Sequence, residues 1–135
     1  MASPETVIAP AGADDLAAVL DIVESAALPV AGIADLFPNG YVVARSRLQI
    51  VGVAGLERYG EVGLLRSVAV RASMRGAGLG RLIVEDRLRA ARAQGLRAVY
   101  LLTTTAADYF RRLGFQDSSR SGAPEALQQS PEFTT

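Results

Sequence analysis

Three glycines lie close together at the start of a helical pattern, in the segment Arg75-Gly76-Ala77-Gly78-Leu79-Gly80. Because glycine has no Cβ, the backbone N–H groups of such a segment can converge on one small anion. The first turn of the following helix adds unpaired N–H groups and the positive end of its dipole. The segment therefore predicts a phosphate-binding loop, although a tight turn without any ligand has the same composition.

Two common phosphate-binding motifs do not fit this loop. A P-loop requires Gly-Lys-[Ser/Thr] at the helix start, but Arg81 follows Gly80 and the chain contains no lysine. The dinucleotide motif G-x-G-x-x-G puts Arg81 at its third glycine and requires an acidic residue about 20 positions further on. That position falls in the apolar run 99–102. What remains is Arg-x-x-Gly-x-Gly after an apolar strand that ends Ser67-Val68-Ala69-Val70.

This loop after such a strand resembles the acetyl-CoA signature of the Gcn5-related N-acetyltransferases (GNAT). In that family the loop amides bind the CoA pyrophosphate, and the open edge of the preceding strand pairs with the pantetheine arm. The resemblance implies acetyl-CoA as the acetyl donor. It also assigns cofactor contacts to the strand end and the loop, namely Val68, Ala69, Val70, Arg75, Gly76, Ala77, Gly78, Leu79, Gly80 and Arg81.

A second motif lies downstream of the loop. The apolar run Ala98–Leu102 predicts a buried strand. Residues 103–115 then predict a short helix, with a near-match to a capping box at Thr105 and a left-handed C-terminal cap at Gly114. A strand, a short helix and a Leu-Gly-Phe ending are spaced in this way in the same family, which strengthens the resemblance.

The short helix departs from the family at the position of the general acid. The family's tyrosine position is Phe110 here, and Tyr109 is its neighbour. One helical step turns a side chain by about 100°, so we expect Tyr109 to point elsewhere. The CoA thiolate can then leave directly and take its proton from water. Thr103 stands where the family often has asparagine; its hydroxyl either binds the pantetheine or is satisfied at the strand end. The resemblance places both Thr103 and Phe110 at the cofactor.

The chain has no histidine, so the base must be a carboxylate, a tyrosine or a chain of waters. If Tyr59-Gly60 is a two-residue turn, alternation puts Glu57, Leu64, Arg66 and Val68 on one sheet face. Leu64 occupies the position of the family's frequent glutamate.

On that face Glu57 can accept the amine proton. Arg66, with Ser67 beside it, can bind an acceptor carboxylate or similar oxyanion in a bidentate manner. The alternative is that Glu57 and Arg66 are exposed hairpin charges. In the family, a backbone N–H near Val68, where the strand bulges, would stabilise the oxyanion.

The elements that must position these residues follow an α+β order. Antiparallel strands come first and a strand–helix–strand step comes later, which predicts a mixed, mostly antiparallel sheet flanked by helices. We expect one GNAT domain over residues 1–135. Helices are predicted from Asp14 or Asp15 to Leu28, and over Leu79–Gln94 with Gly95 as its C-terminal cap, with short turns at Ile33–Phe37 and Pro124–Gln128. The remaining strands are predicted at Thr6–Ala9, Tyr41–Arg45, Gln49–Arg58 and Glu61–Val70.

Composition excludes some functions. The chain has no cysteine, which excludes an acyl-cysteine intermediate, and its net charge of +0 argues against nucleic acid as a partner. No apolar run approaches the ~20 residues of a membrane helix. The first ten residues lack a signal-peptide pattern, so we expect a cytoplasmic protein. An exposed sheet edge and an apolar tail would suit a homodimer.

Narrower resemblances point to the acceptor. Thr103-Thr104-Thr105 followed by Phe110-x-x-Leu-Gly-Phe is similar to the acetyltransferase domain of bacterial N-acetylglutamate synthases. Residues 55–60, 64–67 and 123–133 look most like short acetyltransferases encoded with arsenic-resistance operons, although thiol ligation of arsenic is excluded without cysteine. These resemblances imply a small amino acid or toxic amino-acid analogue as acceptor. One alternative is an acetyltransferase for another amine, such as an aminoglycoside. The other is a non-catalytic protein that senses acyl-CoA.

Overall fold

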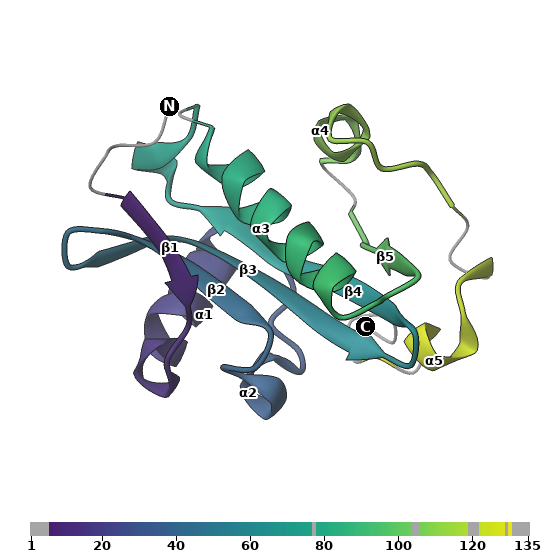
Figure 1. Cartoon of the computed structure of the whole chain (residues 1–135). Coiled ribbons are helices and arrows are strands. Elements are labelled where there is room, and N and C mark those ends of the chain that lie inside the picture. The colour runs from purple at the N-terminus through teal and green to yellow at the C-terminus, as the bar shows by residue number, and fades with distance from the viewer. Residues whose placement is uncertain (1–5, 77, 104–105, 119–121, 129, 131–135) are drawn as a thin grey trace.

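Five strands form one sheet in the order β1-β2-β3-β4-β5, as the computed structural model shows (Figure 1). The structure describes residues 6–76, 78–103, 106–118, 122–128 and 130. The first four strands pair antiparallel, and β5 joins β4 in parallel because helix α3 crosses between them. The predicted mixed, mostly antiparallel sheet is confirmed. The strands are β1 (Thr6–Pro10), β2 (Tyr41–Ser46), β3 (Gln49–Tyr59), β4 (Val62–Val70) and β5 (Ala98–Tyr100).

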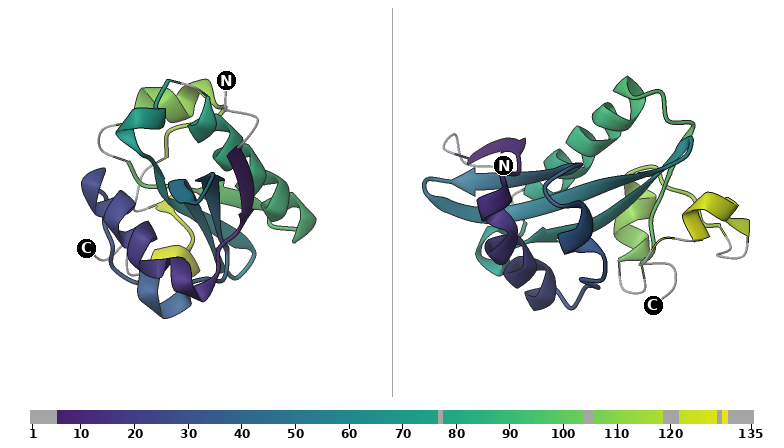
Figure 2. Two further views of the ribbon diagram at one scale, coloured as in Figure 1. Left: turned by 90° about the vertical axis from the view of Figure 1, so that its left-hand side faces the viewer. Right: turned by 90° about the horizontal axis from the view of Figure 1, so that it is seen from below.

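Helices cover both faces of this sheet. Figure 2 shows α1 and α3 on opposite faces. The described helices are α1 (Leu16–Ser25), α2 (Ile33–Leu36), α3 (Leu79–Ala93), α4 (Ala107–Arg112) and α5 (Glu125–Gln128), with 3-10 turns at Ala13–Asp15 and Ala72–Met74. Both long helices follow the predicted ranges closely, and Gly95 ends α3 in the predicted left-handed conformation (φ 74°).

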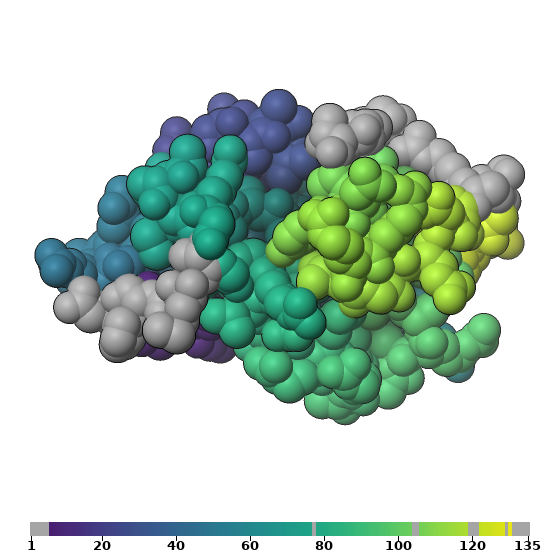
Figure 3. All heavy atoms as spheres, turned by 90° about the horizontal axis from the view of Figure 1, so that it is seen from above, coloured from purple at the N-terminus to yellow at the C-terminus, as the bar shows by residue number. Residues whose placement is uncertain are grey.

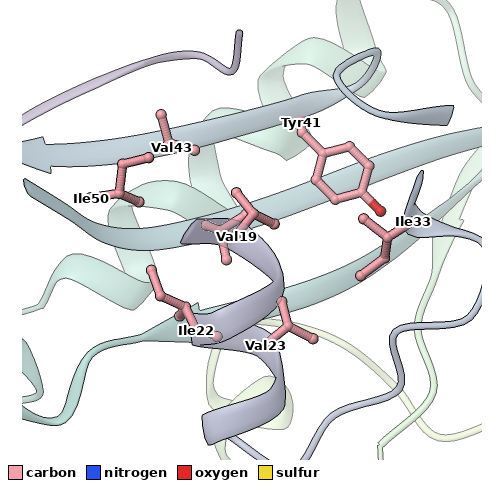
Figure 4. Packing of buried hydrophobic residues seen from close by; sticks show 9 residues of the cluster. Val19, Ile22, Val23, Ile33, Tyr41, Val43 and Ile50 are labelled. Carbon is pink, nitrogen blue, oxygen red and sulfur yellow. The ribbon is translucent and has the colours of Figure 1, made fainter. Parts of the chain in front are cut away.

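The core is divided by the sheet. On one face, Val19, Ile22 and Val23 of α1 pack fully buried against Tyr41 and Val43 of β2 (Figure 4). On the other face, Leu79 and Ile83 of α3 cover Val42, Ala44, Val51 and Ala54. Burying each large apolar side chain stabilises the fold by about 1.5–3 kcal/mol, so both helices are held firmly.

Asp15 occupies the N-cap position of α1, within the predicted pair Asp14 or Asp15, but its side chain makes no capping hydrogen bond to this helix. Its Oδ2 accepts from the Gly12 N–H at 2.8 Å and from Arg45 Nη2 at 2.6 Å. The Arg45 hydrogen bond is the main reason that the pKa of Asp15 lies below its usual value. The carboxylate therefore closes the 3-10 turn that leads into α1 and ties it to β2.

The hairpin between β3 and β4 turns one residue later than predicted. Tyr59 pairs with Val62, so the turn residues are Gly60 and Glu61 instead of Tyr59-Gly60. Glu57 consequently pairs with Leu64. Gly60 has φ 64°, which glycine adopts without strain, so it suits the first position of the Gly60-Glu61 turn.

A β-bulge interrupts β4 near its end. Gly55 pairs with Arg66 and Val53 with Ala69, so Ser67 and Val68 together stand opposite Ala54. Ser67 has φ 59°, a strained value for a residue with a side chain. Arg66 still shares a face with Glu57, as predicted, but Val68 packs with the α3-side clusters. The prediction that Val68 shares the face of Glu57 was wrong because the extra residue reverses the alternation.

Candidate functional site

The edge of β4 that faces β5 is open over most of its length. β5 pairs with β4 only from Ala98 to Tyr100, opposite Val62–Leu64. β4 continues to Val70, and among the described residues no strand pairs with 65–70 on that side. The predicted strand Ala98–Leu102 is therefore too long, and its residues are only half-buried because β5 is an edge strand. An open strand edge can accept an extended ligand through main-chain hydrogen bonds.

The glycine loop lies directly beyond the end of this open edge. Gly76 and Gly78 have φ values of 84° and 79°, which glycine adopts readily and other residues avoid. A Cβ at either position would meet nothing within 4 Å, so the space above the loop is open. Gly78 immediately precedes α3, so the loop amides and the helix N-terminus adjoin. Ala77, also predicted to contact the cofactor, lies outside the described residues. The described glycines thus leave room for a phosphate group.

The side chains around the loop have separate roles. Arg75 is exposed, and its Nε donates to the Val70 carbonyl oxygen at 3.1 Å, which fastens the loop to the end of β4. Arg81 is also exposed and donates from Nε to Glu85 Oε2 at 3.3 Å. Leu79 is buried beneath the loop, so it anchors the helix and can offer a ligand only its amide. Both arginines next to the glycines in sequence are thus exposed, and each has a partner within the chain.

Helix α4 lies across the open edge from the loop. Figure 3 shows a furrow between α4 (lime green) and the teal segment around residues 70–76. Phe110 is buried against Leu65 and Val84 and makes an edge-to-face contact with Phe115 at 5.7 Å between ring centroids. The Phe115 N–H donates to the Phe110 carbonyl oxygen past Gly114, which has φ 103°. The predicted left-handed cap at Gly114 is confirmed.

Thr103 precedes α4, and its side chain is engaged within the chain. Its Oγ1 accepts from the Ala106 N–H at 3.0 Å, just before the helix begins. The capping box predicted at Thr105 lies outside the described residues. Of the two alternatives for Thr103, the satisfied hydroxyl is the one seen, and the residue is exposed.

A buried polar cluster lies on the other face of the sheet, around Glu57. Glu57 Oε1 accepts from the Tyr59 hydroxyl at 2.9 Å, and Oε2 accepts from the Tyr41 hydroxyl at 3.4 Å. Arg66 Nη1 lies 3.5 Å from Glu57 Oε2. The side chain of Arg66 is 0% exposed and that of Glu57 is 1% exposed. The alternative of exposed hairpin charges is therefore wrong. Tyr41 was not predicted from the sequence, because it is 16 residues from Glu57.

Arg66 also holds the loop between α1 and α2. Its Nη1 donates to the Ala31 carbonyl oxygen at 2.6 Å and its Nη2 to the Pro29 carbonyl oxygen at 3.0 Å. Its Nε donates to Ser67 Oγ at 3.3 Å. An acceptor carboxylate could reach this buried guanidinium only if the 29–31 loop moved, so a direct clamp requires a conformational change. The cost of burying the charge is offset by these protein partners.

Tyr59 makes a testable contribution to stability at alkaline pH. Burial, and secondly the hydrogen bond to Glu57, raise the pKa of Tyr59 from 10.0 to about 12. The folded protein thus holds this proton more tightly than the unfolded chain does. Stability is complete below about pH 10 and falls as pH rises toward about 12, because the unfolded chain loses the proton first. Tyr59→Phe should flatten this fall in urea-unfolding measurements; an unchanged slope would contradict the assignment.

The rest of the described structure adds two negative findings. None of its helices combines the length and apolar character needed to cross a bilayer. Within the same described ranges, no three or more acidic side chains gather in an arrangement that could hold a metal ion.

Comparison with known proteins agrees with this geometry. The family model described as an acetyltransferase (GNAT) domain matches residues 38–117, which include the hairpin, the glycine loop and α4. An amino-acid acetyltransferase of Pseudomonas fluorescens is 39% identical over 66 residues, which are 49% of this chain. The chain spans only 15% of the length of that relative.

Two solved structures share the fold. N-acetylglutamate synthase from Neisseria gonorrhoeae, complexed with coenzyme A and N-acetyl-glutamate, has a TM-score of 0.84 at 17% identity, covering 95% of this chain and 32% of that one. Mycobacterium tuberculosis Rv2747, in complex with CoA and NLQ, has a TM-score of 0.77 at 25% identity, covering 90% and 78%. The family match, the glycine loop and the open strand edge agree: the chain belongs to the acetyltransferase (GNAT) domain family, whose enzymes take their acetyl group from acetyl-CoA.

Proposed function

We propose that this protein transfers an acetyl group from acetyl-CoA to the amine of a small amino acid or amino-acid analogue by direct attack. The observation that carries the proposal is a continuous path: the open β4 edge at 65–70 leads straight to Gly76, Gly78 and the N-terminus of α3. The path suits a long ligand with a peptide-like arm and a phosphate group, because an open edge offers main-chain hydrogen bonds and the loop offers convergent amides.

Each part of the path has a proposed task. The amides of residues 76–81 bind the CoA diphosphate, with Arg75 and Arg81 beside them. The backbone of Val68, Ala69 and Val70 pairs with the pantetheine arm, and Phe110 of α4 and Thr103 before it border this arm. When bound, acetyl-CoA supplies a thioester whose C–S bond breaks as the amine forms its C–N bond, and water protonates the departing thiolate.

The bulge at Ser67 and Val68 is proposed to stabilise the developing oxyanion. An extra residue in one strand leaves a backbone group outside the ladder, and here that residue borders the open edge. A fixed N–H at this place can stabilise negative charge without reorganising. Such electrostatic stabilisation is often the largest contribution to the catalysis of acyl transfer. We therefore assign this role to the backbone N–H near Val68.

Glu57 is the proposed base for the amine. Its carboxylate is buried, so the proton must pass through the hydroxyl of Tyr59 or Tyr41, both of which contact it. Glu57→Gln should lower kcat by about 100-fold and leave CoA affinity unchanged, because general bases contribute about 10²–10⁴. Steady-state kinetics beside CoA calorimetry measures both. Glu61→Gln, in the exposed hairpin turn, is the control; equal kcat values for both variants would remove Glu57 from the mechanism.

We further propose that the acceptor is an amino acid or a toxic analogue of the arsenic-resistance type. The 39% identity to an amino-acid acetyltransferase over half of this chain supports an amino-acid acceptor. Arg66 and Ser67 border the acceptor side and hold the 29–31 loop over it. We propose that Arg66 acts on the acceptor through this loop, and that it meets the acceptor carboxylate directly only when the loop opens.

A thiol-release assay with acetyl-CoA tests the proposal. The panel comprises glutamate and other amino acids, phosphinothricin, an arsenic-containing amino-acid analogue and an aminoglycoside. Turnover is expected with one or more amino-acid-like compounds and not with the aminoglycoside. Turnover with the aminoglycoside alone would replace the acceptor class. Tight CoA binding without turnover of any compound would favour the acyl-CoA sensor.

A further inference from the structure

Tyr109 occupies a place that the sequence did not reveal. Its hydroxyl lies against the first turn of α3: a Cβ built on Gly80 would be 2.8 Å from Tyr109 Oη and 3.7 Å from Cζ. The Tyr109 ring packs edge-to-face on Phe110, with centroids 5.2 Å apart. The side chain therefore reaches from α4 to α3, and it approaches the end of the glycine loop.

This contact lies at the mouth of the proposed cofactor path. Gly80 is one helical turn before Val84, which packs with Leu65 and Phe110, so Gly80 is on the side of α3 that faces α4. The built Cβ of Gly80 is also 3.9 Å from Val70 at the end of β4. Tyr109 Oη thus lies where the glycine loop, the end of the open edge and α4 come together.

The hydroxyl has the properties of a donor to an anion. None of the described hydrogen bonds engages Tyr109 Oη, and its side chain is only half-buried. Burial is the largest influence and raises the pKa of Tyr109; Arg81 and Arg112 act against it and Glu85 acts with it, so the hydroxyl keeps its proton at neutral pH. A neutral O–H beside two cationic side chains is suited to a phosphate oxygen or to the adjoining pantetheine.

The thioester end of the path is too far away for the same hydroxyl. Val68 precedes Val70 by two residues, and a strand advances about 3.3 Å per residue, so Val68 lies roughly 6–7 Å further along the edge. A hydroxyl hydrogen bond spans about 2.5–3.0 Å. Tyr109 at Gly80 is therefore placed for the diphosphate end and not for the sulfur.

Resting on the proposed function, we propose that the Tyr109 hydroxyl donates a hydrogen bond to the diphosphate end of bound CoA. This makes Tyr109 a cofactor-binding residue, and the contact depends on this chain having tyrosine at 109 and phenylalanine at 110. A side chain at Gly80 would force this hydroxyl to shift, because a Cβ built there lies 2.8 Å from Tyr109 Oη. Phe110 thus occupies the family's proton-donor position, and its neighbour Tyr109 makes the cofactor contact.

The experiment compares wild type and Tyr109→Phe with two donors, acetyl-CoA and acetyl-pantetheine, which lacks the diphosphate. Tyr109→Phe should raise the Kd of CoA and the KM of acetyl-CoA about tenfold, because a hydrogen bond to a charged group is lost. It should leave kcat at saturation within about twofold and leave kcat/KM for acetyl-pantetheine unchanged. Loss of kcat with both donors would instead make Tyr109 the proton donor, and unchanged CoA affinity would also overturn the proposal.

Gly80→Ala provides a second, independent test of the same contact. In wild type the added methyl should displace the tyrosine and weaken CoA binding about as much as Tyr109→Phe does. In the Tyr109→Phe background, where the colliding atom is absent, Gly80→Ala should add little. Additive losses would contradict the contact. Wild-type protein that binds no CoA at all would refute the proposed function itself, an outcome distinct from either failure.

Discussion

Gly78→Asp should lower CoA affinity by at least 100-fold. Gly78 has φ 79°, and its substitution places a carboxylate in the open space above the loop where the diphosphate is proposed to lie. Two effects add: a non-glycine residue at this φ costs about 1–2 kcal/mol, and like charges repel close to the helix N-terminus. Calorimetric titration with CoA measures the loss.

Two control variants separate these effects. Gly78→Asn has nearly the same shape and backbone strain without the charge, so it should lose much less affinity. Gly95→Asp imposes the same backbone strain at the opposite end of α3, where φ is 74° and a Cβ would also meet open space. It should leave CoA binding unchanged. Equal losses for Gly78→Asp and Gly95→Asp would mean that the loop does not hold the phosphate.

Arg66→Met should be the most destabilising single change in the acceptor half. It leaves the buried Glu57 carboxylate without the cation that pairs with it in the described part of the chain, and it removes the donors to the Pro29 and Ala31 carbonyl oxygens. Breaking a buried pair from one side costs about 3–5 kcal/mol, a large share of the roughly 5–15 kcal/mol that stabilises a domain. Urea unfolding measures the change in the free energy of unfolding.

A matched exposed ion pair serves as the control. Arg97 and Glu61 lie 3.0 Å apart with side chains 73% and 72% exposed, so Arg97→Met should cost no more than about 1 kcal/mol. Adding Glu57→Gln to Arg66→Met removes both buried charges and should recover part of the loss. If Arg66→Met is as mild as Arg97→Met, the ion pair does not hold the fold together. In folded protein, a released 29–31 loop should raise the acceptor KM and leave CoA affinity intact.

The elements of this fold were predictable because their signals are local. The apolar stripes of α1 and α3, the left-handed glycines at 95 and 114, and the alternating strands each lie within a short stretch of sequence. The glycine loop was found for the same reason. The hairpin register was missed by one residue, since both Tyr59-Gly60 and Gly60-Glu61 are acceptable turns and only packing on both faces selects one.

The acceptor side depends on contacts that no local pattern encodes. Arg66 meets carbonyl groups 35 and 37 residues away, and backbone carbonyls carry no sequence signal at all. Tyr41 reaches Glu57 from another strand. The orientation of Tyr109 was likewise beyond reach, because helical geometry shows that it differs from Phe110 but not that it ends against Gly80. A bulge in β4 was expected from the family, but its effect on which way Val68 points was not.

The side of β4 at residues 65–70 that no described strand pairs with has a consequence for handling the protein. A bare row of main-chain donors and acceptors can template pairing between molecules, which natural sheets usually prevent by covering or shortening their margins. If CoA fills this row as proposed, ligand-free samples should self-associate at lower concentration than CoA-saturated ones. Coenzyme bound along this edge of β4 would then also reduce precipitation, in addition to supplying the acetyl group.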